Sequence, residues 1–173
     1  MNRKNSIKLY NILLPLWFII FIPSWLWLLL LIPANYLIDR IVLKWSLGDL
    51  EDKGLFCRKH NWKICLAGFL SDFIGAALLL IIAVPLVSLT DNSFIEDAAG
   101  GIMMNPFTNV LSLIITIAAI ALSAACIYLL DRKILQKAGL TMEQAKKSAI
   151  RLALITAPYL YLIPSEILYR DGF

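Results

Sequence analysis

Long apolar segments account for most of the sequence, and short polar stretches separate them. Four such segments run over residues 9–38, 64–89, 107–138 and 142–168. A helix needs about 20 mostly apolar residues to cross the ~30 Å hydrocarbon core of a bilayer. The second and third segments meet this length, whereas the fourth is weaker because it carries Arg151 and Glu166. The pattern predicts an all-α integral membrane protein in which residues 1–173 form one polytopic domain.

The first apolar segment contains no charged residue but is interrupted by prolines. Pro23, followed by Ser24, divides it into two halves, each of which is about 21 Å long as a helix and too short to span a membrane. The segment is therefore either a helical hairpin that turns at Pro23 or a single span kinked by proline. The expected architecture is three transmembrane helices plus this N-terminal proline-broken hairpin or fourth span.

Capping residues mark the ends of the third and fourth segments. Asn105 followed by Pro106 is typical of a helix start, with asparagine as the cap and proline in the first turn. Gly139 is a stop signal for the third helix. Thr141 and Gln144 have the spacing of a capping box that begins the fourth helix. These signals predict an antiparallel pair of helices joined by a very short turn.

The basic residues are clustered, and their distribution predicts the orientation of the chain. The sequence has 16 Lys and Arg against 12 Asp and Glu, a formal net charge of +4. Lys and Arg gather before the first segment and in loops 40–63 and 131–147, whereas loop 90–109 has none. Because cytoplasmic loops hold the excess of positive charge, we expect both basic loops to be cytoplasmic and to contact anionic lipid headgroups. The acidic loop 90–109, in which residues 93–96 predict a short helix, would be external, and we expect the protein to lie in the plasma membrane.

Composition supports the membrane class and excludes several others. The chain is 60% hydrophobic and 16% charged, whereas soluble domains are about 45–50% apolar and about 25% charged. No basic stripe is interleaved with aromatic residues, so nucleic acid is not an expected partner. The three cysteines match no disulfide framework, and no set of four ligands predicts structural zinc. We therefore predict neither a metal nor a cofactor.

Small residues recur at helical spacing on one face of each of the last three segments. The faces comprise Ser112, Thr116, Ala119, Ser123 and Cys126; Ala67, Gly68, Ser71 and Gly75; and Ala149, Ala153 and Ala157. Helices pack closely in lipid where small residues meet. These faces are expected to hold one monomer together or, alternatively, to form a homo-oligomer.

Four polar residues form a candidate intramembrane cluster. Asp72 lies nine residues beyond Lys63, about 13 Å along a helix, and an ionisable group at such depth suggests a functional site. Arg151 is its expected partner. Asn35 and Asp39 are one turn apart near the cytoplasmic end of the first segment. The alternative is a purely structural role, in which Asp72 pairs with Arg151 or Arg151 extends to the headgroups.

The sequence favours a small transport or channel component whose polar cluster surrounds Asp72. The alternative is a non-transporting membrane subunit or scaffold that binds a partner protein or a lipid. A membrane-embedded enzyme ranks third, because His60 has no nucleophile at a recognisable spacing and no glycine-rich phosphate loop is present. We therefore expect no catalytic residues.

Overall fold

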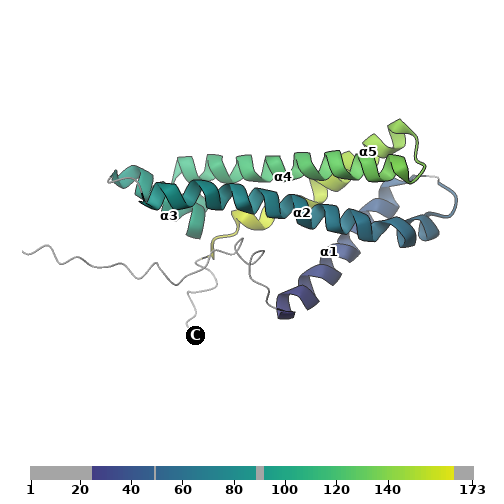
Figure 1. Cartoon of the computed structure of the whole chain (residues 1–173), viewed down its shortest axis with the longest axis horizontal. Helices are drawn as coiled ribbons and strands as arrows, with labels where there is room; N and C mark the ends of the chain where they lie inside the picture. Colours follow the sequence, from purple (N-terminus) through teal and green to yellow (C-terminus); the bar gives the residue numbers. More distant parts are fainter. Residues whose placement is uncertain (1–24, 49, 89–91, 166–173) are drawn as a thin grey trace, which may run out of the picture.

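The computed structural model describes residues 25–48, 50–88 and 92–165, and this part of the chain is helical and contains no strand (Figure 1). The α-helices are α1 (Trp25–Ser46), α2 (Lys53–Ser88), α3 (Ser93–Met104), α4 (Val110–Lys137) and α5 (Met142–Thr156). Two 3₁₀ turns, η3 (Pro106–Thr108) and η4 (Tyr159–Leu162), precede α4 and follow α5. The all-α prediction is therefore confirmed for these residues.

Helices α2 and α4 lie side by side and form the long axis of the bundle (Figure 1). They contain 36 and 28 residues, which corresponds to lengths of about 54 Å and about 42 Å. Both are long and apolar enough to cross a membrane, and they are the two such helices in the described part of the chain. The expected third and fourth spans are not confirmed.

Helix α5 is shorter than the sequence pattern suggested. The segment 142–168 was expected to be one helix, but α5 ends at Thr156 after 15 residues, a length of about 22 Å. The reason is Pro158, because a proline disfavours helical geometry in the residue before it. Ala157 accordingly has ψ 150°, and the chain continues into η4.

Helix α1 contains the second half of the first apolar segment and continues eight residues beyond it, to Ser46. Pro33 lies inside α1 without ending it. The proposed hairpin turn at Pro23 falls outside the described residues. Figure 1 shows α1 crossing the bundle obliquely, with the start of the helix furthest from the other elements.

Most of the predicted capping signals are confirmed, with two shifts. Thr141 and Gln144 form the expected capping box of α5, and Gly139 has the left-handed φ of +100° that ends α4. Asn105 caps the short turn η3, whereas Asn109 caps α4. The short helix α3 is present, but Asn92 rather than Ser93 is its cap.

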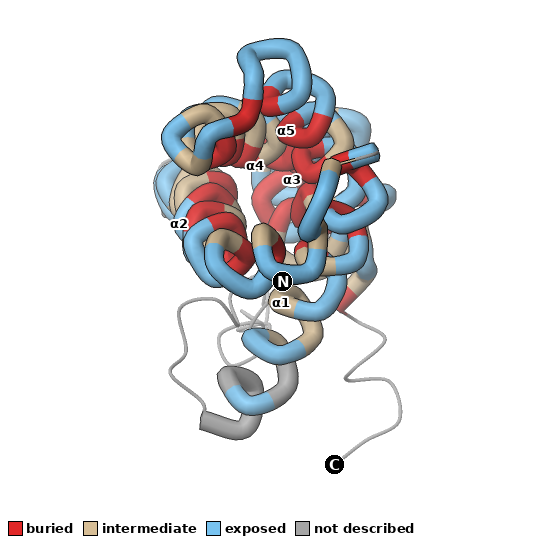
Figure 2. Tube along the Cα trace, turned by 90° about the vertical axis from the view of Figure 1, so that its right-hand side faces the viewer, coloured by how far each residue is buried: buried red, intermediate tan, exposed pale blue. Residues whose placement is uncertain are grey.

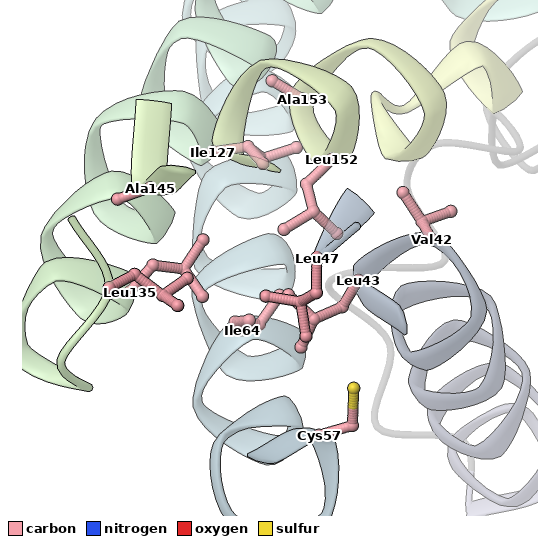
Figure 3. Close-up of a cluster of buried hydrophobic side chains, with 11 residues drawn as sticks. Val42, Leu43, Leu47, Cys57, Ile64, Ile127, Leu135, Ala145, Leu152 and Ala153 are labelled. Carbon is pink, nitrogen blue, oxygen red and sulfur yellow. The ribbon is translucent and has the colours of Figure 1, made fainter. Parts of the chain in front are cut away.

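Buried side chains form two apolar clusters at opposite ends of the bundle, and Figure 2 shows buried residues lining its interior. The first cluster joins α1, α2, α4 and α5 around Leu43, Ile64 and Leu152 (Figure 3). The second joins α2, α3, α4 and η4 and includes Leu79 and Tyr161. Polar residues occupy the α2 and α4 positions between the two clusters.

The small-residue faces form close helix contacts, as predicted. Ser112, Thr116, Ala119 and Ser123 of α4 are buried, and so are Ala67, Ser71 and Gly75 of α2. Cys126 is only half-buried, because the buried face continues through Ile127 instead. The faces of α2 and α4 meet at Gly75, where an added Cβ would collide with Ser123.

Candidate functional site

A cavity of about 240 Å³ lies between α1, α2 and the segment that follows α5. Three of the four residues singled out from the sequence line it, namely Asn35, Asp39 and Asp72. Asn35 and Asp39 face it from successive turns of α1, and Asp72 faces it from the middle of α2. The structure thus brings these three side chains together.

The two carboxyl groups differ in their surroundings. Asp39 is 5% exposed, and the Cys65 thiol donates a hydrogen bond to its carboxyl group. Asp72 is half-buried, and its Oδ1 has no hydrogen-bond partner. Asp39 interacts electrostatically with Asp72. Two acidic side chains therefore share one cavity wall without a neutralising cation among the residues that line the cavity.

Arg151 does not join this cluster. Its guanidinium carbon lies 4.4 Å from the centroid of the Trp45 ring, a cation–π contact between α5 and α1. No ion pair connects Arg151 with Asp72 within the described part of the chain, so the expected direct pairing is absent. The physical reason is that Trp45, 62% exposed at the end of α1, offers the guanidinium a partner near the basic end of the bundle.

The end of α5 completes the cavity. Residues 155–161 line it, and the break at Pro158 directs the chain back against α2. Tyr161 donates a hydrogen bond from its hydroxyl group to the backbone oxygen of Asp72 at 2.5 Å. Because carbonyl groups at a helix C-terminus carry partial negative charge, the end of α5 adds to the negative potential from the two carboxyl groups.

The hydroxyl donors around the cavity are already engaged. Thr156 donates to the oxygen of Leu152 at 2.9 Å, and Tyr159 donates to the oxygen of Leu154 at 2.6 Å. Tyr161 is bonded to Asp72 as described above. The polar side chains that remain for a bound molecule are therefore the carboxyl groups of Asp39 and Asp72 and the amide of Asn35.

Two further buried polar residues were missed by the sequence analysis. Asp131 of α4 is 1% exposed and neither of its carboxyl oxygens has a hydrogen-bond partner. Asn61 of α2 is fully buried; its Nδ2 donates to the oxygen of Tyr36 at 2.8 Å, and its Oδ1 has no partner. Asp131 also interacts electrostatically with Asp39. The sequence feature that indicates burial of Asp131 is its position two turns beyond Ser123, on the small-residue face of α4. Its position beside the basic residues Arg132 and Lys133 suggests an exposed loop instead.

A second depression, of about 580 Å³, lies where the turn between α1 and α2 meets the start of α5. It is lined by Glu51, Gln144 and Lys147, all of which are exposed. Although this depression is larger, the smaller cavity is the better candidate site because its acidic groups are buried or half-buried. Within the described residues, no group of three His, Cys, Asp or Glu side chains could hold a metal ion.

Comparison with protein-family models, with curated proteins and with solved structures gave no match for this chain.

Proposed function

We propose that the protein is an integral membrane protein whose apolar surface faces lipid. Large apolar side chains are exposed along both long helices, including Leu70 and Ile81 of α2 and Ile114 of α4. The interior holds small polar residues such as Ser71 and Thr116. Soluble proteins rarely expose apolar patches of this extent, whereas small residues between helices and large apolar residues outside suit a bilayer.

The proposed orientation places the basic end of the bundle in the cytoplasm and α3 outside the plasma membrane. The turns that join α1 to α2 and α4 to α5 lie at the same end, and α3 lies at the other (Figure 1). This arrangement collects the Lys and Arg of loops 40–63 and 131–147 on one side, where they would contact anionic headgroups.

Cysteine labelling tests this orientation. In a variant without the native cysteines, Glu96→Cys is expected to react with an impermeant maleimide in intact cells, because Glu96 is exposed on α3. Lys146→Cys, exposed at the start of α5, should react only after permeabilisation. The opposite pattern would invert the proposed topology.

We further propose that the protein is a transport or channel component that binds a cation in the cavity between α1 and α2. The observation that supports this function is that Asp39 and Asp72 line the cavity together while no Lys, Arg or His does. Asp72 lies about 13 Å beyond Lys63 along α2, near the middle of a ~30 Å hydrocarbon core. Carboxyl groups and helix C-terminal carbonyls at this depth are typical cation ligands in transporters.

Cation flux into proteoliposomes tests this function. The protein is expected to increase uptake of a monovalent cation, measured with an internal fluorescent indicator, and Asp72→Asn should reduce that uptake at least about tenfold because a charged ligand is lost. Asp97→Asn is the matched control, since Asp97 is exposed on α3 and lies far from the cavity. Binding without flux would favour the alternative of a non-transporting subunit, and absence of both would reject the proposal.

A further inference from the structure

We infer that the ligand of this cavity is a small organic ammonium ion with an apolar portion, rather than a metal ion. This inference rests on the proposed cation site and specifies its substrate class. Three independent properties of the cavity support it: its size, the character of its walls and the state of its hydrogen-bonding groups.

The cavity is too large and too poor in ligands for a coordinated metal ion. A water molecule occupies about 30 Å³ in the liquid, so a volume of about 240 Å³ can hold a molecule of several heavy atoms. Metal ions need several oxygen, nitrogen or sulfur ligands at short distances. The described residues provide no group of three acidic, histidine or cysteine side chains suited to that task.

The walls of the cavity combine one acidic region with apolar surface. Asp39 and Asp72 supply the acidic region, whereas Leu31, Phe69 and Leu160 supply apolar surface. A ligand that fits both must carry a positive charge and an apolar body. Aromatic rings near such a site also favour a cation through their electron-rich faces.

The two carboxyl groups favour a ligand that donates hydrogen bonds. The hydroxyl groups of Thr156, Tyr159 and Tyr161 all donate to backbone oxygens, whereas Oδ1 of Asp72 accepts no hydrogen bond. Asp131, which is 1% exposed and whose carboxyl oxygens also lack partners, interacts electrostatically with Asp39. A primary ammonium group supplies both the missing donors and the missing charge.

The rim of the cavity is apolar and accessible from the side of the bundle. Ile38, Ile155 and Tyr159 line the cavity and are 46%, 47% and 49% exposed. In the proposed membrane these side chains face the acyl chains, so an amphiphilic amine dissolved in the bilayer reaches the cavity without crossing the basic end of the bundle.

Calorimetric titration of the protein in lipid nanodiscs tests the inference with benzylamine as the probe. Benzylammonium is expected to bind, and benzyl alcohol, which has a similar shape but no charge, should not. Asp39→Asn and Asp72→Asn should each weaken benzylammonium binding by about tenfold or more, because each removes a charge-assisted hydrogen bond.

A steric variant tests whether benzylammonium binds in this cavity. Gly68 lines the cavity, and a Cβ added there meets nothing within 4 Å, so Gly68→Leu should fill the cavity and abolish benzylammonium binding. Gly100→Leu is the matched control, because Gly100 is exposed on α3 and its added Cβ is equally free. Circular dichroism and elution volume establish that each variant is folded.

Binding of sodium or potassium without binding of benzylammonium would overturn the organic ligand and leave the proposed cation site intact. Equal binding of benzylammonium and benzyl alcohol would overturn it as well, because the site would then recognise only the apolar body. Binding of benzylammonium without flux in proteoliposomes would retain the ligand class and reject the transport function.

Discussion

Gly75→Leu is expected to abolish accumulation of folded protein. Gly75 lies where α2 and α4 make a close contact, and a Cβ at this position would overlap Ser123 Oγ. The same Cβ would lie 3.1 Å from the backbone oxygen of Ala119 and 3.2 Å from Cε2 of Tyr161. A leucine adds three more carbon atoms, so the two helices must separate and the contact between Tyr161 and Asp72 must break.

Yield and elution volume in mild detergent measure the loss of folded protein. Smaller substitutions at the same contact give the change in the free energy of unfolding. Gly75→Ala should cost about 1–3 kcal/mol, the range for an extra methyl group in a packed interior. The second substitution Ser123→Gly should restore part of this loss, because it removes the overlapping oxygen. Gly68→Ala is the control and should be tolerated, since its Cβ meets nothing within 4 Å. Normal yield of Gly75→Leu would show that α2 and α4 do not meet at this residue.

Asp131→Leu is expected to stabilise the protein by about 1–3 kcal/mol, the cost of a buried polar group without hydrogen bonds. Asp131 lies one turn from both Ile127 and Leu135, which belong to the first apolar cluster, and its oxygens have no partner. Leucine has the same branching, so its two methyl groups would occupy the positions of the carboxyl oxygens and extend the cluster.

Thermal unfolding in detergent measures the stabilisation. Asp97→Leu serves as the control and should give no gain, because Asp97 is exposed on α3. If Asp131→Leu instead lowers the unfolding temperature, the carboxyl group has a bound water or cation as its partner. A stabilised variant that has also lost cation flux would show that Asp131 is retained for function rather than for folding.

The features that depend on neighbouring residues were the most predictable from the sequence. The capping box at Thr141 and the stop at Gly139 are local, and both were identified correctly. The apolar pattern predicts an end for α5 that is too late, because apolar residues continue beyond Pro158, the residue that stops the helix. Long-range contacts were harder to predict. The positions of Asp39 and Asp72 along their helices predicted that the two side chains lie in one cluster. The partner of Arg151 could not be predicted in this way, because it depends on how α5 packs beside α1.

The depth of the cavity has an electrical consequence. An elementary charge that crosses the whole membrane changes its energy by about 2.3 kcal/mol for each 100 mV of membrane potential. In the proposed orientation, Asp72 lies near the middle of the hydrocarbon core, so a monovalent cation that reaches it from outside crosses roughly half of the field. The interior-negative potential of a cell would thus favour occupancy from outside by about 1 kcal/mol per 100 mV, or about sixfold. The position of Asp72 along α2 therefore also determines how strongly the site senses voltage.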